Sequence, residues 1–319
     1  MATNTRRVLL GIDVSKTKLD VNVHGAERVE QIDNEACSID ACLKRYLGAA
    51  IAVEATNTYH CLLVERALKR GLVVYLLSGY QLKHYAKGVG YRMRNDAIDA
   101  RLISRYLAHE IDRLKPYEPK SPQHERLWML LKRRATVIQS RQQLQQSLSG
   151  INELRVQAEQ FRQTYAQVVA DLEARMETLV DELGWRQDVK RLLGMPGVGP
   201  LTAIALVMAS RSGTFIHHDP FIAYLGLDVR AKDSGTFRGQ RKLTKQGDGE
   251  YRRLLYCAAM AARRTPGYFQ ARYEALQARG LTSTAALVII ARKLATVAFH
   301  LLRKQEDFDP AQLTRQAAA

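Results

Sequence analysis

Cysteine is scarce in this sequence, and its spacing argues against the common structural metal sites. Only four of the 319 residues are cysteine, and no two of them form a Cys-x-x-Cys motif. A zinc site is therefore not expected. We interpret Cys37, Cys42, Cys61 and Cys257 as buried apolar side chains in a protein of a reducing compartment.

Long apolar runs are also missing. A helix needs about 20 apolar residues to cross a bilayer, and no apolar run in the chain approaches that length. Residues 1–16 do not resemble a signal peptide, because their short apolar stretch runs directly into an acidic residue. We therefore expect a cytoplasmic protein with no membrane partner, and its length predicts about two domains.

Acidic residues are few relative to basic ones. Lys and Arg number 48 against 32 Asp and Glu, which gives a formal net charge of +16 and a pI near 9.8. Basic side chains that neutralise phosphates release counterions and gain affinity. A solvated surface, or a patch for an acidic protein, would give the same composition. The size of the excess favours nucleic acid, without distinguishing DNA from RNA.

The first third of the chain alternates between strand and helix patterns. Apolar or alternating segments predict strands at 7–15, 18–25, 27–33, 49–55 and 72–78. Helical spacing predicts helices at 38–47, at 59–70 and from about residue 95. Because their connections are short, the first three strands should form an antiparallel meander. We expect an α/β domain of order β-β-β-α-β-α-β-α.

The middle third changes to a charged, helical composition after a proline-bearing linker at 117–123. Leu130, Val137, Leu144 and Ile151 recur every seven residues, and a second helix carries Val168, Leu172, Met176, Leu179 and Leu183 at helical spacing. Two such helices predict a coiled-coil hairpin or a dimer arm. Two ordinary core helices would explain the pattern equally well.

The last third opens on a glycine- and proline-bearing corner between two apolar helical stretches, over 191–209. This pattern is typical of a helix-hairpin-helix, whose backbone N–H groups can approach a phosphate, although any tight helix corner favours the same residues. A basic, glycine-rich loop follows, and a helix over 283–303 should belong to the core. The expected domains are 1–116, 117–188 and 189–319.

Four carboxylates of the first third could converge. Asp13 ends the first predicted strand and Glu54 the fourth, while Asp96 and Asp99 share one face of a helix. Crowded carboxylates repel one another unless a cation joins them. Oxygen ligands suit Mg²⁺, and two such ions can clamp a phosphodiester. Together with the order of elements, these acids indicate an RNase H-like nuclease fold. Surface ion pairs with the neighbouring Arg92, Arg94, Arg101 and Arg105 are the simpler interpretation.

Six segments carry a resemblance to a known family. GIDVSKTKLDV, VEATNTYH and NDAIDARLISRYL resemble the RuvC-like domain of the DEDD insertion-sequence transposases, a family that includes the pilin-gene invertases. GVGPLTAIALV, FIAYLGL and SGTFRGQRKLTKQGDGEYRRLLYCAA resemble the C-terminal transposase domain of that family. The resemblance covers nearly the whole chain in order, and the middle helices are similar to the coiled-coil segment of the family.

The resemblance implies an α/β RuvC-like domain, a coiled-coil middle and a mostly α C-terminal domain. It implies that Asp13, Glu54, Asp96 and Asp99 are catalytic acids that bind Mg²⁺, with two ions expected. It also implies that Ser234 is a nucleophile that forms a covalent phosphoserine link. Without the resemblance, Ser234 would be interpreted as an ordinary turn residue, because serine before glycine is common in turns. Only the basic residues around it suggest a role in binding a scissile phosphate.

The resemblance further implies partners and an assembly. The partners are the DNA of the element ends and target, and a structured non-coding bridge RNA that guides recombination. The assembly is a homotetramer of homodimers, in which the acidic site of one subunit works with the serine of another, at the nucleoid of a bacterium. The expected nucleic-acid contacts are Lys16, Arg92, Arg94, Arg101, Lys232, Arg238, Arg241, Lys242 and Lys245.

Other functions stay open at this point. A site-specific DNA invertase of the same family would use identical chemistry. A RuvC-like junction endonuclease would hydrolyse DNA with the four acids and leave Ser234 structural, and a non-catalytic nucleic-acid-binding protein would use neither. GIDVSKTKLDV could also begin an actin-like sugar kinase, but we find neither a second phosphate loop nor an adenosine site.

Overall fold

The computed structural model describes residues 7–55, 58–90, 96–230, 233–234, 237–238, 242–311 and 313. It describes the backbone alone for residues 96–98, 230, 233–234, 237–238 and 242. The chain divides into two compact units, Met1–Pro119 and Lys120–Ala319.

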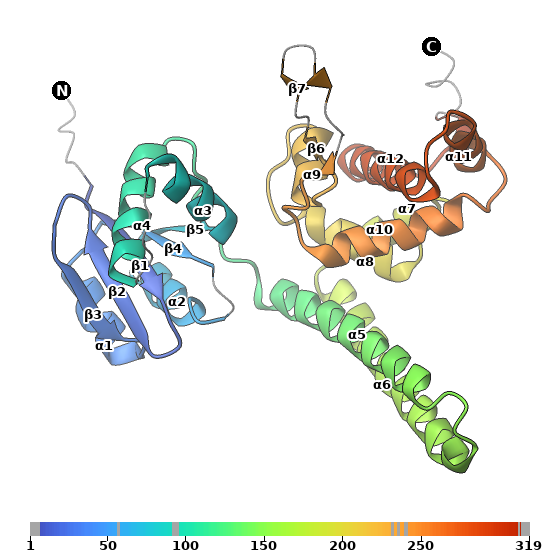
Figure 1. Ribbon diagram of the computed structural model, residues 1–319, viewed down its shortest axis with the longest axis horizontal. Helices are drawn as coiled ribbons and strands as arrows, with labels where there is room; N and C mark the ends of the chain where they lie inside the picture. Colours follow the sequence, from blue (N-terminus) through green and yellow to red (C-terminus); the bar gives the residue numbers. More distant parts are fainter. Residues whose placement is uncertain are drawn as a thin grey trace. The chain divides into compact units, whose positions relative to one another are not determined.

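The N-terminal unit is built on a five-stranded mixed sheet (Figure 1). β1 (Leu9–Val14), β2 (Lys18–Val23) and β3 (Val29–Asp33) form an antiparallel meander. β4 (Ala50–Glu54) and β5 (Val73–Leu77) continue the sheet in parallel with β1, which gives the order β3-β2-β1-β4-β5. The five predicted strands and the predicted meander are therefore confirmed.

Helices cover both faces of this sheet. α1 (Ala36–Lys44) and α2 (Cys61–Lys69) pack on one face, and α3 (Gly79–Gly88) and α4 (Asp96–Glu110) pack on the other. The buried strand β4 shows how the sequence specifies this sandwich. Its large side chains point to the α1 and α2 face and its alanines to the α3 and α4 face, because successive residues of a strand alternate.

Helix α4 rests directly on the backbone of β1. A Cβ atom at Gly11 would lie 2.1 Å from the backbone N of Ser104 and 2.4 Å from the carbonyl O of Ala100. Only glycine allows this approach. A buried hydrogen bond fixes the contact, since the Ser104 hydroxyl donates to Oδ1 of Asn22 on β2 over 2.7 Å.

One helix of this unit was not predicted. α3 lies between the last strand and α4, so the order of elements is β-β-β-α-β-α-β-α-α. The prediction of four buried thiols is wrong for three of them. Only Cys42 is buried, whereas Cys37, Cys61 and Cys257 are exposed because they lie on the outer faces of amphipathic helices.

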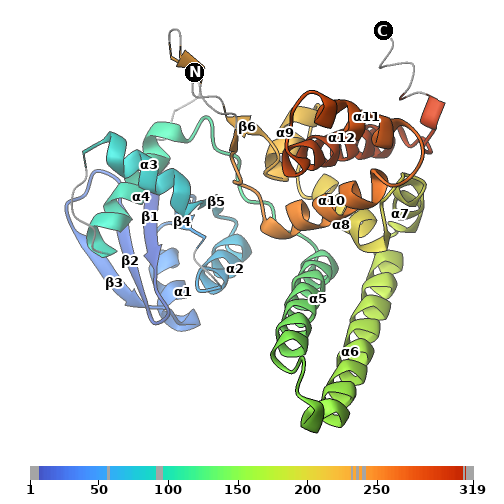
Figure 2. The same ribbon diagram turned by 45° about the vertical axis from the view of Figure 1, so that its right-hand side comes forward.

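The C-terminal unit begins with a helical hairpin. α5 (Pro122–Ser147) and α6 (Arg155–Glu182) run side by side, joined through a short turn with a 3-10 helix at Asn152–Leu154 (Figures 1 and 2). The base of the hairpin is core, because Leu130 and Met176 are buried with the rest of the unit. Its distal part extends away from that core. The base therefore matches the core-helix interpretation, and the use of the distal part as a coiled coil or dimer arm stays a prediction.

In the part of this unit that the structure describes, six further helices form the body. They are α7 (Arg186–Leu193), α8 (Pro200–Ser210), α9 (His218–Tyr224), α10 (Gly249–Ala262), α11 (Tyr268–Ala278) and α12 (Ser283–Lys304). α12 packs against the other five, which confirms its prediction as a core helix. By length and composition α12 could cross a membrane, contrary to our expectation that no segment could, but 61% of its most apolar window is buried in this core.

Candidate active site

Two carboxylates lie near the ends of neighbouring parallel strands. β1 and β4 pair through Ile12 and Val53, and Asp13 and Glu54 are the next residue of each strand. Because Ile12 and Val53 both face α1 and α2, strand alternation directs Asp13 and Glu54 to the face under α3 and α4. Both acids are half-buried.

The third acid lies on the helix that covers this face. Asp99 precedes Ala100, the residue whose carbonyl touches Gly11, and Gly11 and Asp13 are two residues apart on the same side of β1. Asp99 is half-buried. Asp96 is the first residue of α4, one turn earlier, and its side chain lies outside the described ones.

Glu54 reaches the beginning of α3. A Cβ atom on Gly79 would lie only 2.4 Å from Oε1 of Glu54, so the carboxylate lies against the first turn of the helix. Ser78 and Gln81 cap this helix reciprocally, since the Gln81 N–H donates to the Ser78 hydroxyl and the Ser78 N–H donates to Oε1 of Gln81. A helix N-terminus stabilises a nearby anion. The Ser-x-x-Gln capping box is the sequence signal that predicts the beginning of α3.

A fifth acid joins this face. Asp20 of β2 stands directly opposite Asp13 in the antiparallel pair, so the two side chains share one side of the sheet. Asp20 is 7% exposed, and Nε2 of Gln31 donates to its Oδ1 over 3.1 Å. The short turn between β1 and β2 sets the register of the two strands, and this register pairs Asp13 with Asp20. The length of that turn is therefore the sequence feature that points to Asp20 as a member of the site.

The described carboxylates do not by themselves complete a metal site. Among the described side chains, no three from His, Cys, Asp or Glu gather closely enough to hold a metal ion. The chemistry of the donors nevertheless fits a hard cation. Asp13, Glu54 and Asp99 offer carboxylate oxygens from one face of the sheet and the helix above it, and Asp20 adds negative charge to the same face.

The proposed nucleophile belongs to the C-terminal unit. Here the predicted glycine-rich loop contains two pairs of very short strands. β6 (Val229–Arg230) pairs with β9 (Lys242–Leu243), and β7 (Asp233–Ser234) pairs with β8 (Phe237–Arg238). The backbone of Ser234 lies opposite Phe237.

The predicted nucleic-acid contacts are only partly described. Lys16 is exposed in the turn after β1, and Lys245 is exposed just after β9. Arg101 is exposed on α4, where its guanidinium donates to the backbone carbonyl of Glu27. The remaining predicted contacts lie outside the described residues (Arg92, Arg94, Lys232, Arg241) or have only their backbone described (Arg238, Lys242).

The predicted helix-hairpin-helix corner connects α7 to α8. Gly197 has a φ of +78°, and a Cβ there would lie 2.3 Å from the carbonyl O of Ala258 on α10. The glycine thus lets the corner pack on α10. The prediction that the corner binds phosphate is not tested by this contact.

Comparison with known proteins agrees with this architecture. A family model for the DEDD domain of transposases matches residues 10–156, and a model described as the transposase IS116/IS110/IS902 family matches residues 189–274. The two matches together define the class, a transposase-family chain with an N-terminal DEDD domain. The chain belongs to the IS110 family of insertion-sequence transposases.

Several relatives extend this comparison. The pilin gene-inverting protein of Moraxella bovis is 27% identical over 270 residues, which are 81% of each chain. An uncharacterised 43.6 kDa protein of insertion element IS110 from Streptomyces coelicolor is 32% identical over 46% of this chain and 33% of its own. Among solved structures, Thermus thermophilus RuvC in complex with a Holliday junction substrate shares 18% identity, at a TM-score of 0.30, over 35% of this chain and all of its own.

Proposed function

We propose that this chain is a recombinase that cleaves and rejoins DNA to mobilise an insertion sequence. One observation carries the proposal. Asp13 and Glu54 lie near the ends of neighbouring parallel strands beneath the helix that bears Asp99, in a chain that belongs to a transposase family. Carboxylates from distant segments thus point to one face of the sheet, where they would handle a phosphodiester if cations accompanied it.

Asp13, Glu54, Asp96 and Asp99 would hold the divalent cations, for which we propose Mg²⁺, two ions per site. When bound, such ions supply the positive charge that stabilises the phosphate oxygens during attack. The protein holds the donors in place. The first turn of α3 faces the carboxylate of Glu54, and the contact of α4 with Gly11 fixes the height of Asp99 above the sheet.

Ser234 would act as the nucleophile. Its Oγ forms a bond to the scissile phosphorus while the bond from phosphorus to one deoxyribose oxygen breaks, and the hydroxyl proton passes to that oxygen. A deoxyribose hydroxyl of another strand then attacks the phosphorus and forms the new phosphodiester. The bond between phosphorus and Oγ of Ser234 breaks, and the proton of the attacking hydroxyl passes to that Oγ. The covalent intermediate conserves the bond energy, so no ATP is needed. Lys242 and Lys245 follow the serine closely in sequence and would stabilise the charged phosphate oxygens.

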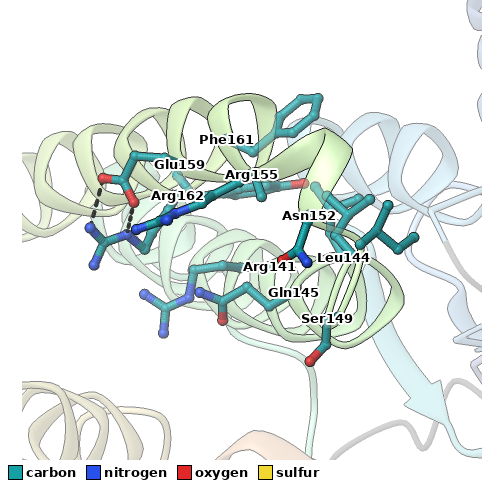
Figure 3. A pocket seen from close by; sticks show the side chains of 14 residues that line it. Arg141, Leu144, Gln145, Ser149, Asn152, Arg155, Glu159, Phe161 and Arg162 are labelled. Carbon is teal, nitrogen blue, oxygen red and sulfur yellow. Dashed lines mark hydrogen bonds and ion pairs between the residues drawn. The ribbon is translucent and has the colours of Figure 1, made fainter.

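A guide RNA and a second subunit complete the proposal. Lys16, Arg101 and their basic neighbours would contact a structured non-coding RNA through its backbone and shape. The distal part of the α5–α6 hairpin would form the dimer contact, and two dimers would form a tetramer. Its tip exposes apolar side chains, since Val156 is 67% and Phe161 49% exposed. A pocket of about 400 Å³ between the two helices there also gathers Arg141, Arg155 and Arg162 (Figure 3).

The chemistry is tested with Ser234→Ala and Asp13→Asn proteins, DNA that carries an element end, RNA extracted with the protein, and Mg²⁺. We expect the parent protein to form a protein–DNA adduct that survives a denaturing gel. Ser234→Ala should form none, and Asp13→Asn should neither cleave nor form the adduct. Ser149→Ala, an exposed serine at the hairpin tip, serves as the matched control and should behave as the parent does.

Other outcomes would change the assignment. Full cleavage by Ser234→Ala would show that the serine is not the nucleophile and would favour a hydrolytic junction endonuclease. Full activity of Asp13→Asn would refute the acidic site. RNase treatment should abolish cleavage if the guide is required, and sequencing the RNA that copurifies with the protein would identify it.

A site-specific DNA invertase is the second candidate. The pilin gene-inverting protein of Moraxella bovis aligns over 81% of both chains, which favours this use of the same chemistry. A plasmid that carries both an invertible and an excisable segment separates the two functions. Inversion without excision supports an invertase, and excision or insertion elsewhere supports a transposase.

A further inference from the structure

The base of the α5–α6 hairpin forms one wall of a second pocket. This pocket of about 360 Å³ is lined by His124 and Trp128 of α5, Tyr224 of α9 and the segment Gln246–Asp248 before α10. Its volume falls within the range of roughly 300–1,000 Å³ that is usual for small-molecule sites. All of its lining residues belong to the C-terminal unit, and none has a role in the proposed chemistry.

Aromatic rings line this pocket. Trp128 stacks on Tyr251 with 4.9 Å between ring centroids and 25° between ring planes, and Tyr224 lies 5.9 Å from Tyr251. His124 completes the wall on α5, where it is 5% exposed. Burial lowers the pKa of His124 to about 4, so this ring is uncharged at neutral pH. Tyr251 occupies one face of Trp128, and Lys132 Nζ lies 5.6 Å from the centroid of the Trp128 ring. The pocket therefore offers aromatic walls and a nearby cation to a planar ligand.

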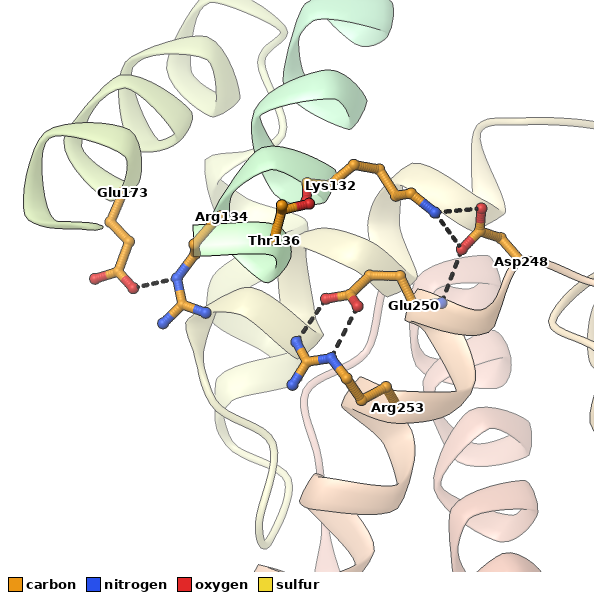
Figure 4. Close-up of polar contacts among 7 residues, drawn as sticks. All are labelled: Lys132, Arg134, Thr136, Glu173, Asp248, Glu250 and Arg253. Atoms are coloured by element: carbon orange, nitrogen blue, oxygen red, sulfur yellow. Dashed lines mark hydrogen bonds and ion pairs between the residues drawn. The ribbon is translucent and has the colours of Figure 1, made fainter. Parts of the chain in front are cut away.

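The charges around the pocket suit a ligand attached to phosphate. Asp248 is neutralised by Lys132, whose Nζ lies 2.9 Å from Oδ2, and it also caps α10 by accepting the Glu250 N–H (Figure 4). Lys120 contributes a cation to the lining, and Gln246 contributes an amide that can both donate and accept hydrogen bonds. No unpaired carboxylate from the described lining residues faces an incoming phosphate.

The pocket is fixed to the base of the segment that contains Ser234. Tyr224 precedes β6 and Gln246 follows β9, and these two short strands pair with each other. Close backbone packing locks the two sides together. A Cβ at Gly247 would lie 2.2 Å from the carbonyl O of Tyr224, so no larger residue fits there. The pocket and the Ser234 segment are thus connected through one pair of short strands.

We propose that the pocket binds an unstacked nucleobase of the strand held at the Ser234 segment. The planar base enters between the α5 wall and the Tyr224 wall, and Gln246 and Lys120 contact its polar edge and its phosphate. A base bound in the pocket would anchor the strand next to the nucleophile. Unstacking that base costs free energy, which its contacts with the aromatic side chains would offset. The inference rests on the proposed function, because it assumes nucleic acid at the Ser234 segment.

The two tryptophans of the chain provide a direct test. In a Trp185→Phe protein, Trp128 is the sole tryptophan, so its fluorescence reports on the pocket. We expect oligo-dT or oligo-U to quench this fluorescence. A matched oligomer of abasic deoxyribose phosphates has the same charge and no base, so it should bind without quenching. Comparing oligo-dT with oligo-U shows whether the pocket prefers DNA or RNA.

Affinity measurements at fixed salt give a second readout. Trp128→Leu should weaken oligo-dT binding about tenfold, which corresponds to ~1.4 kcal/mol, the scale of one base–aromatic contact. Its affinity for the abasic oligomer should not change. Gln246→Ala should weaken oligo-dT binding by a smaller factor. Because Gln246 is exposed, this variant should fold normally, so it tests the pocket even if the Trp128→Leu protein does not fold. Ile216→Ala, which shortens an exposed apolar side chain of the same unit, is the control and should leave both affinities unchanged.

The outcomes separate the two proposals. If the parent binds oligo-dT and the abasic oligomer equally and Trp128 is not quenched, the base pocket is refuted while nucleic-acid binding stands. If the fluorescence changes only with protein concentration, the pocket instead receives a side chain of another copy, and the inference fails. If the parent binds no oligonucleotide and forms no DNA adduct, the proposed function itself fails and the pocket assignment fails with it.

Discussion

Asp13 lies directly opposite Asp20 across the antiparallel pair of β1 and β2, on the face that α4 covers. Like charges in this position repel one another and destabilise the pair. Gln31 donates to Asp20 but brings no positive charge. The two carboxylates therefore add their negative charges to one side of the sheet, where a bound cation would be stabilised.

Asp20→Asn should relieve this repulsion while keeping an oxygen that can accept from Gln31. In EDTA we expect the variant to be more stable than the parent by about 0.2–1 kcal/mol. Added Mg²⁺ should stabilise the parent more than the variant, because only the parent keeps the full negative charge. Thermal unfolding with EDTA or Mg²⁺ measures both effects. Asp33→Asn, an exposed partner of Lys18, is the control and should change neither value much.

Gly11→Ala should destabilise the N-terminal unit. Its new Cβ would lie 2.1 Å from the backbone N of Ser104, so α4 must move away from β1. Overpacking of this kind costs about 1–3 kcal/mol, which urea unfolding can detect. Gly88→Ala is the matched control, because nothing lies within 4 Å of its would-be Cβ. Equal stability of both variants would show that α4 is not held tightly on the sheet.

The sequence predicted the elements that carry strong periodic patterns. The buried strand β4 and the core helix α12 were placed correctly because apolar runs and helical spacing extend over many residues. The strands β6 to β9 were not predicted, since two-residue strands carry no period. The exposed thiols of Cys37 and Cys61 were misjudged because the inner face of each helix depends on its packing partner.

The candidate site could be predicted from the sequence only where it depends on the order of the strands. The shared sheet edge of Asp13 and Glu54 followed from strand order, which the apolar runs predict. The pairing of Asp13 with Asp20 depends on the register that a turn sets, and the alternation of apolar residues alone does not specify that register. The pocket of Trp128 and Tyr224 joins residues nearly a hundred positions apart, through helix packing that local patterns do not encode.

His124 should make the stability of the C-terminal unit depend on pH. Burial lowers its pKa from 6.5 to about 4, so the folded state favours the neutral ring. Between these values the unfolded chain binds more protons, and stability therefore falls as pH drops from 6.5 to 4. The full loss is about 3 kcal/mol. The hydrogen bond from Arg66 lowers the pKa of Asp40 from 3.8 to about 2, so the stabilisation from this carboxylate is fully present above pH 3.8 and is lost only as the pH falls toward 2.

His124→Gln should flatten this pH dependence. Urea unfolding of the C-terminal unit at pH 7 and pH 4.5 measures the difference in the parent and the variant. His217→Gln, which replaces an exposed histidine of the same unit, should keep the slope of the parent. An unchanged slope in His124→Gln would mean that other groups titrate in this window and that the buried ring is not responsible.

The tip of the α5–α6 hairpin should control the oligomeric state. Val156 and Phe161 are 67% and 49% exposed there, and exposed large apolar side chains are typical of interaction sites. Val156→Glu with Phe161→Glu places charges where a partner helix would pack, so the mass measured by light scattering should fall toward that of the monomer. Gln160→Glu adds the same type of charge at a neighbouring polar position and should keep the parent mass. If the double variant keeps the parent mass as well, the dimer contact lies elsewhere in the chain, and the exposed tip would then be free to meet nucleic acid through Arg141, Arg155 and Arg162.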